Sequence, residues 1–418
     1  MPLKRLERLR NAYGPGCAAQ KLALLATLRR KRLGSAREVE RLHEMLCFLR
    51  AYPDDARVLA RATRMLAAFA HRSDLRAQRH ALESSGIAGT AIRYPFFWPT
   101  ARWLARRWPR RLALDRLDKA ADRAIGRLFG VRSGFAALDR IRPRDLADAA
   151  HFVRLVEAMP GDAFAHEAFY DAIEPVLELS PGRGTPNRTL AWHRVGPVAW
   201  QRAPLDRSRP DLQAEIRRSP RRVRRVRARE GARLIDLGRA AMATRSRDLD
   251  AFAYGDPRDV RIVEDGEGLA FALNAMVPER RKAAAAVYGV LTLKNGVPIG
   301  YMDLGVAARH VEIAFNTFES FRGTEAAHTL ARTLAMLRRV FRASSFGIDR
   351  YQLGLGNHEA IESGAWWFYY KLGFRPRAAA AKRLARRELA RWRADRAYRS
   401  SGATLQRLAR WPLHYRDH

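Results

Sequence analysis

Apolar residues recur at helical spacing through the first 180 residues of the chain. The segment 37–53 carries them one or two helical turns apart, at Val39, Leu42, Met45, Leu46 and Leu49. A second run with the same period covers 56–69, and Asp54 just before it is the expected N-cap. This spacing is typical of amphipathic helices, so the pattern predicts a mostly helical N-terminal domain over residues 1–180.

The pattern changes after residue 230, where short apolar runs alternate with longer amphipathic segments. Residues 287–305 predict a β-hairpin, because Asn295-Gly296 is the type I′ turn signature and residues that suit strands flank it. Further strands are predicted at 259–266, 269–277, 311–317 and 349–356, and helices at 231–245, 325–341 and 357–374. Residues 231–379 are therefore expected to form an α/β (α+β) domain with one mixed sheet.

Two stretches of different composition border this domain. Residues 181–230 begin with a loop rich in Pro, Gly and Ser and end with eight arginines between Arg217 and Arg229. This arginine run is either a solvated connector or an arm that binds a polyanion. Residues 380–418 form a basic tail, for which we predict a helix carrying Leu384, Leu389 and Trp392.

The charge of the chain widens the range of expected partners. The 418 residues carry a formal net charge of +35, which attracts nucleic acid, anionic lipid or another polyanion in a salt-dependent way. Basic residues are spread over the whole chain, so the charge alone does not locate a binding surface. Trp98, Trp103 and Trp108 lie among arginines, and they either stack on bases, lie at a membrane interface or pack in a helical core.

Composition also indicates the compartment. No apolar run approaches the roughly 20 residues that a membrane span needs, and the N-terminus lacks the apolar core of a signal peptide. We therefore expect a soluble, cytoplasmic protein. Cys17 and Cys47 are the two cysteines, which fits a reducing compartment and offers neither a disulfide framework nor a CxxC metal site. The histidines are scattered, so we expect no bound metal.

The loop from Arg322 to Ala327 follows a predicted strand and opens a predicted helix. Free amides at a helix N-terminus carry partial positive charge and suit a phosphate. Gly323 lets the backbone approach a ligand closely, and Arg322 adds a forked donor. Glu325 opposes an anion only if its side chain faces that anion. The loop therefore either cradles a phosphate or only begins a helix.

With this order of elements, residues 231–379 resemble the GNAT acetyltransferase superfamily. Its members place an R/Q-x-x-G-x-G/A loop after the fourth strand, and backbone amides of that loop hold the pyrophosphate of acetyl-CoA. Here Arg322-Gly323-Thr324-Glu325-Ala326-Ala327 matches at Arg322 and Ala327, whereas Glu325 replaces the usual glycine. Asn357 begins a segment similar to N-x-x-A, and the run from Tyr369 to Phe374 resembles Y-x-K-x-G-F.

This resemblance implies an N-acyltransferase that uses acetyl-CoA, or another acyl-CoA, as cosubstrate and an unidentified amine as acceptor, with no metal. The cosubstrate would contact the loop from Arg322 to Ala327 together with Asn357, and its pantetheine arm would pass Asn316 and Thr317. The alternative is a GNAT-like domain without catalysis, within a basic protein that binds nucleic acid or a membrane surface. Acceptor-binding loops vary freely on one fold, so the resemblance does not identify the amine.

Acyl transfer to an amine uses a base for the attacking amine and an acid for the departing thiolate. The resemblance points to Tyr369 as the acid. Tyr369 lies further from Asn357 than is usual in the family, so Tyr370 is a rival, and either tyrosine could instead belong to the core. For the base the resemblance favours Glu312, with Glu319 as a second choice, and the alternative for Glu312 is a solvent-facing residue on an alternating strand.

Overall fold

The computed structural model describes residues 1–281 and 285–417 of the chain. These residues form two compact units, each with its own hydrophobic core. The first unit comprises Met1–Arg194, Ala199–Ala203 and Ala232–Gly255, and the second comprises Val195–Val198, Pro204–Gly231 and Asp256–His418. The mixed α/β class expected from the sequence is confirmed, while the division of the chain differs from the four predicted ranges.

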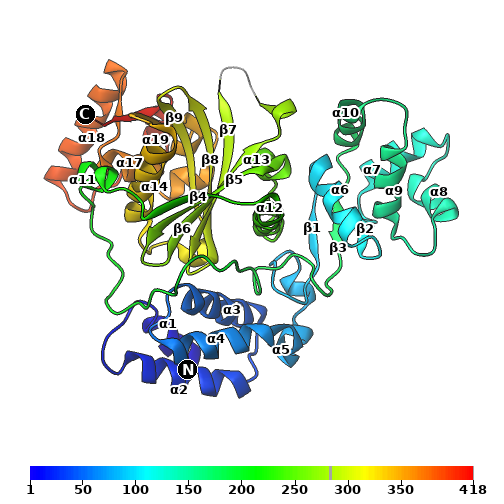
Figure 1. Cartoon of the computed structure of the whole chain (residues 1–418), viewed down its shortest axis with the longest axis horizontal. Helices are drawn as coiled ribbons and strands as arrows, with labels where there is room; N and C mark the ends of the chain where they lie inside the picture. The colour runs from blue at the N-terminus through cyan, green and yellow to red at the C-terminus, as the bar shows by residue number, and fades with distance from the viewer. Residues whose placement is uncertain (282–284, 418) are drawn as a thin grey trace. The chain divides into compact units, whose positions relative to one another are not determined.

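The first unit is mostly helical. Its helices are α1 (Pro2–Arg8), α2 (Cys17–Arg30), α3 (Ala36–Ala51), α4 (Ala56–Ala67), α5 (Ser73–Ala77), α6 (Trp98–Arg107), α7 (Lys119–Leu128), α8 (Gly134–Ile141), α9 (Asp148–Glu157), α10 (Ala163–Ile173) and α13 (Asp250–Ala253), with α12 (Ala228–Ala243) running into it from the second unit. The unit also holds a small antiparallel sheet that the sequence did not predict, with strand order β1-β3-β2 (Figure 1). Its strands are β1 (Ile92–Tyr94), β2 (Leu112–Leu114) and β3 (Leu177–Leu179).

Two details of this unit bear on the sequence predictions. The N-cap of α4 is Asp55, whose carboxylate accepts from the N–H groups of Arg57 and Val58, and not Asp54. Asp54 instead lies 2.9 Å from Lys21 Nζ, so the first of the two aspartates is used for tertiary pairing. Trp98 is buried, and Trp103 and Trp108 pack edge to face with ring centroids 5.3 Å apart. These tryptophans therefore belong to the helical core, which was one of the three predicted readings.

A nine-stranded sheet dominates the second unit, with strand order β11-β12-β10-β9-β8-β7-β6-β5-β4 (Figure 1). The strands are β4 (Arg222–Arg225), β5 (Gly255–Gly266), β6 (Leu269–Met276), β7 (Ala286–Lys294), β8 (Val297–Ala307), β9 (His310–Thr317), β10 (Ser345–Ile348), β11 (Arg375–Pro376) and β12 (Leu413–Arg416). β9 and β10 pair in parallel, whereas β7, β8 and β9 form an antiparallel series. The hairpin turn predicted at Asn295-Gly296 is present, with positive φ at both residues.

The helices of the second unit are α11 (Leu212–Arg217), α14 (Ala326–Phe341), α15 (Arg350–Leu353), α16 (His358–Glu362), α17 (Ala365–Leu372), α18 (Ala379–Ala394) and α19 (Gly402–Leu408). Buried side chains of α14 and α17 join those of β8, β9 and β10 in one core. Arg332 on α14 adds a buried ion pair with Asp265 on β5 and donates to the carbonyls of Glu215 and Arg218. This network ties α14 to β5 and to the C-terminal end of α11.

Several predictions for the C-terminal half are wrong. Residues 349–356 are not a strand: Arg350–Leu353 form α15, and the strand lies just before them at Ser345–Ile348. The single helix predicted at 357–374 is two helices, α16 and α17, because Gly364 between them has a φ of 66°. The C-terminal tail is more than a helix, since β12 returns to the sheet between β10 and β11. Residues 181–230 likewise contain α11 and β4.

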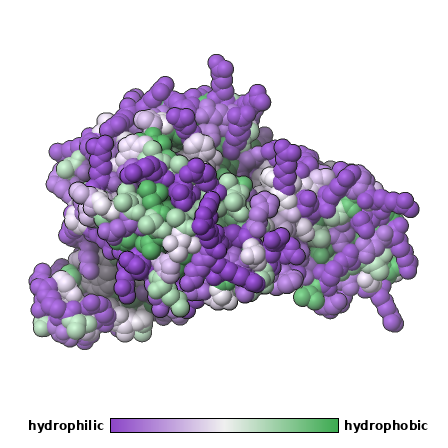
Figure 2. Space-filling model, turned by 90° about the horizontal axis from the view of Figure 1, so that it is seen from below, coloured by the Kyte–Doolittle hydropathy of each residue, from purple (hydrophilic) through white to green (hydrophobic). Residues whose placement is uncertain are grey.

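The described residues, 1–281 and 285–417, were compared with the requirements of a membrane span and of a metal site. None of the helices in this part of the chain combines the length and apolar character that a membrane span needs. Among the same residues, no group of three or more His, Cys, Asp or Glu is arranged to hold a metal ion. Figure 2 shows one face of the molecule, on which hydrophilic residues predominate and apolar residues occur in small patches.

Candidate functional site

A pocket of about 300 Å³ lies in the second unit, where β9 ends and α14 begins. Its lining includes seven residues that the sequence singled out: Asn316, Thr317, Arg322, Gly323, Ala326, Asn357 and Tyr369. Phe315, Phe368 and Ala365 give it an apolar side, and Glu359, Gln352 and Ser363 add polar groups. The end of β9, the loop, the start of α14 and the helices α15, α16 and α17 therefore meet at one cavity.

The cavity opens where β9 and β10 stop pairing. The parallel ladder covers His310, Val311 and Glu312 on β9 and ends at the pair Glu312 and Gly347. β9 continues to Thr317 beside β8, so residues 313–317 pair with β8 on one side and no longer pair with β10 on the other. In an antiparallel ladder alternate residues turn their N–H and C=O groups away from the partner strand. These groups form a polar backbone edge that leads into the pocket.

The loop before α14 is shaped by a glycine and a threonine. Gly323 has a φ of 71°, which favours glycine, and a Cβ added there would meet no atom within 4 Å. The space above Gly323 is therefore open to a ligand. Thr324 is buried and its hydroxyl donates to the carbonyl of Phe321 at 2.6 Å, so Thr324 closes the turn from inside and does not line the pocket.

The start of α14 offers backbone donors to this pocket. Glu325 is the N-cap and makes no side-chain cap hydrogen bond, and the first helical bond runs from Thr329 N–H to Glu325 O at 2.8 Å. The amides of residues 326–328 therefore point out of the helix end, with the partial positive charge of the helix dipole. Ala327, like Glu325, does not itself line the pocket. Ala326 does, and it marks where these amides meet the cavity.

The side chain of Glu325 does not oppose an anion here. Its carboxylate lies 3.5 Å from Nζ of Lys294, the last residue of β7, and the Lys294 side chain is nearly buried. The negative charge is therefore compensated by a neighbouring strand. This pairing directs the Glu325 carboxylate toward β7 and leaves the amides of residues 326–328 available.

Arg322 and Glu359 form an ion pair at the pocket. Arg322 Nη2 donates to Glu359 Oε1, and each side chain is 53 % exposed. Asn357 caps α16, because its Oδ1 accepts from the N–H of Ala360 at 3.1 Å. The Asn357 cap fixes the start of the helix that carries Glu359, and so it positions Glu359 opposite Arg322.

The structure separates the two tyrosines. Tyr369 lines the pocket and is 3 % exposed, and burial raises the pKa of its hydroxyl well above the usual value. Tyr370 does not line the pocket: its ring stacks on Trp366 at 4.9 Å and carries the guanidinium of Arg375 at 4.1 Å. Gly364 separates α16 from α17, and both Asn357 before this break and Tyr369 after it line the cavity.

Glu312 and Glu319 lie outside the pocket lining. Glu319 is exposed in the short turn before the loop. Glu312 is exposed on β9 at the point where β9 and β10 separate, five residues before Thr317, and five residues of strand span about 17 Å. Glu312 therefore marks the other end of the exposed strand edge, and its role as the base stays a prediction.

Two histidines that sequence reasoning missed lie beside Glu312. His310 precedes it by two residues on β9, and His414 on β12 is the cross-strand partner of Gly347. Their ring centroids are 6.2 Å apart. A Cβ on Gly347 would lie 3.0 Å from His310 Nε2 and 3.8 Å from His414 Nδ1, so both imidazoles converge on this glycine.

The histidines differ in their surroundings. Ser345 Oγ lies 3.0 Å from His310 Nδ1, whereas His414 Nδ1 is buried with no hydrogen-bond partner among the described residues. Burial, helped by Arg377 and His310, lowers the pKa of His414, so its imidazole is neutral near pH 7. No sequence signal marked this residue, because His414 comes from a segment predicted as helix and reaches the site only through β12.

Scans of family models, curated proteins and solved structures return no match to this chain.

Proposed function

We propose that the second unit is an N-acyltransferase that moves an acetyl group, or another acyl group, from coenzyme A to an amine. The observation that carries this proposal is the pocket at the end of β9, which collects residues from four segments expected to contact one acyl-CoA. The pairing of Glu325 with Lys294 supports the catalytic reading over a GNAT-like domain without catalysis, because it removes the main objection to anion binding by the loop.

Successive features of the site suit the successive parts of an acyl-CoA: pyrophosphate, pantetheine arm and acyl end. The amides of residues 326–328 and the guanidinium of Arg322 would hold the pyrophosphate, which needs donors and positive charge. The backbone edge of residues 313–317 would bind the amides of the pantetheine arm as an added strand does. The acyl end would then lie along this edge, between Tyr369 in the pocket and Glu312 at the far end.

The chemistry at that end requires two proton transfers. The amine nitrogen attacks the thioester carbonyl, a C–N bond forms, and the C–S bond breaks as the thiolate leaves. The attacking amine gives up a proton to the neutral imidazole of His414, or to the carboxylate of Glu312 beside it. Tyr369 remains protonated at neutral pH, because burial raises its pKa, and its hydroxyl is the donor to the sulfur.

Calorimetric titration of acetyl-CoA tests the proposal. The wild-type chain should bind one acetyl-CoA at high salt, and Arg322→Glu should abolish that binding because it places a carboxylate at the pyrophosphate. Arg386→Glu is the matched control: it makes the same charge change on the exposed side of α18, outside the pocket.

A protein of charge +35 binds many anions weakly, so ATP and 3′,5′-ADP serve as competitors. Equal binding of all these anions, lost with salt and indifferent to Arg322→Glu, would contradict the proposal. If acetyl-CoA binds but no free coenzyme A thiol is released with any of the amines offered, the cosubstrate site stands and the transferase activity is refuted.

A further inference from the structure

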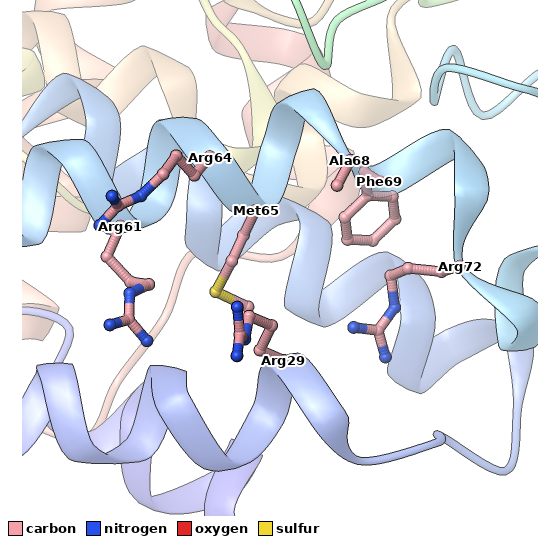
Figure 3. Close-up of a pocket in the computed structure, with 7 residues that line it drawn as sticks. All are labelled: Arg29, Arg61, Arg64, Met65, Ala68, Phe69 and Arg72. Atoms are coloured by element: carbon pink, nitrogen blue, oxygen red, sulfur yellow. The ribbon is translucent and has the colours of Figure 1, made fainter.

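A second pocket, of about 340 Å³, lies in the first unit between α2 and the segment that runs from α4 to α5. Four arginines line it, Arg29, Arg61, Arg64 and Arg72, together with Met65 and Phe69. Figure 3 shows Arg29 reaching from α2 toward the thioether of Met65, while Arg61 extends from α4 toward α2 and Arg72 lies at the other end of the gap. Two helices thus direct cations into one concavity.

Three of these cations lack an acidic partner. Within the described part of the chain, no acceptor is within hydrogen-bond distance of the guanidinium groups of Arg29, Arg61 and Arg64. Many other arginines of this chain are paired, as Arg57 on the same helix is with Asp55. Arg61 and Arg64 are also one turn apart on α4, where like charges destabilise a helix by a few tenths of a kcal/mol. The arrangement therefore has unused donors and mutual repulsion that an anion would relieve.

Arg72 is the fixed edge of the pocket. Its Nε donates to Asp74 Oδ1 at 2.9 Å, and its terminal nitrogens donate to the carbonyls of Leu28 and Lys31 at 3.2 and 2.9 Å. Arg72 thereby holds the end of α2 against the start of α5, which sets the distance between Arg29 and the arginines of α4. The site is built on a braced pair of segments.

The floor of the pocket is apolar. Met65 and Phe69 are buried residues of the first unit and line the cavity between the arginines. A volume near 340 Å³ is at the small end of the range for ligand pockets, which combine apolar walls with a few placed polar groups. Arginine is the side chain best suited to bind phosphate, through two parallel N–H donors.

We propose that this pocket binds a small phosphorylated organic molecule, with its phosphate on Arg29, Arg61 and Arg64 and its carbon skeleton against Met65. A concave site with an apolar floor favours a compact ligand over a nucleic-acid backbone, which needs a groove that follows successive phosphates. The site is independent of the acyl-CoA pocket, because all of its residues belong to the first unit.

Phosphorus NMR titration of the full-length protein with phenyl phosphate and with inorganic phosphate tests this proposal at 150 mM salt. Phenyl phosphate should bind in a 1:1 ratio and more tightly than inorganic phosphate, because its ring covers Met65. Arg61→Ala and Arg29→Ala should each weaken the binding of phenyl phosphate about tenfold. This factor corresponds to the loss of about 1.4 kcal/mol of charge-assisted hydrogen bonding. Both side chains lie at the surface, and circular dichroism confirms that the variants fold.

The controls separate this site from general charge and from the other pocket. Arg30→Ala removes an exposed arginine next to Arg29 that does not line the pocket, and it should change the affinity by less than twofold. Arg322→Glu should leave phenyl phosphate binding intact even where it abolishes acetyl-CoA binding. Equal losses in Arg30→Ala and Arg61→Ala would overturn the proposal. So would an oligothymidylate that binds more tightly with length and loses that affinity in Arg61→Ala, because the surface would then serve nucleic acid.

Discussion

Replacing Glu359 by glutamine should tighten acetyl-CoA binding. Arg322 is held by the Glu359 carboxylate at the pocket, so a pyrophosphate must first separate the pair before it can use the guanidinium. Glu359 also lines the pocket and places a negative charge near the expected phosphates. Glu359→Gln removes both obstacles and keeps the size of the side chain.

The exposure of the pair sets the size of the effect. With 53 % of each side chain exposed, the ion pair is worth about 0.2–1 kcal/mol, as for other solvated pairs. If binding no longer has to break this pair, the affinity for acetyl-CoA rises by up to about fivefold, since 1.4 kcal/mol is a factor of ten. The lost repulsion acts in the same direction. We therefore expect an affinity gain of about two- to fivefold at low salt, which shrinks as salt screens the charges.

Calorimetry at two salt concentrations measures the gain. Glu362→Gln is the matched control, because Glu362 lies on the same helix, pairs with His358 in solvent and does not line the pocket. It should leave the affinity unchanged. An unchanged or weaker affinity in Glu359→Gln would show that Arg322 does not contact the ligand, and the assignment of the loop would fail.

Three further experiments test the proton donor, the base and the buried ion pair. Tyr369→Phe should lower kcat for acyl transfer at least about a hundredfold with unchanged acetyl-CoA affinity, whereas Tyr370→Phe, outside the pocket, should leave kcat within twofold. Steady-state kinetics measure kcat and calorimetric titration measures the affinity, and equal effects of the two substitutions would show that Tyr369 is not the proton donor. The pH profile of kcat/KM should fall as pH drops through the lowered pKa of His414, because only the neutral imidazole accepts a proton, and His414→Gln should remove that acid limb; a limb that survives assigns the base to another group. Asp265→Ala should reduce the unfolding free energy by about 3–5 kcal/mol in urea titrations, because the buried Arg332 then keeps only the more distant Glu215 carboxylate at 3.3 Å, and a loss below 1 kcal/mol would contradict that.

Local signals predicted the central part of the second unit. The turn at Asn295-Gly296 fixes the β7–β8 hairpin, because both residues tolerate the positive φ that the turn requires. The long helix α14 has a clear apolar stripe, and the strand before it was recognised as well. The loop between them was predicted as a candidate phosphate site from Arg322, Gly323 and the helix start, and three of its six residues, Arg322, Gly323 and Ala326, line the pocket.

Long-range placement was not predictable in the same way. β10 and β12 have four residues each, too few for a periodic pattern, and their identity as strands depends on pairing with each other and with β9. His310 and His414 are more than a hundred residues apart, so only the return of β12 to the sheet brings them together. Arg29 and Arg61 likewise meet through helix packing, in a chain where arginine is too common to mark a site.

Hydrogen–deuterium exchange with and without acetyl-CoA tests the central claim most directly, because it locates the ligand on the chain. The account predicts slower exchange at the amides of residues 313–317 and 326–328, with no change in α2 and α4. Arg322→Glu should erase this protection. Protection elsewhere, or none at the start of α14, would contradict the claim that this loop cradles the pyrophosphate of an acyl-CoA.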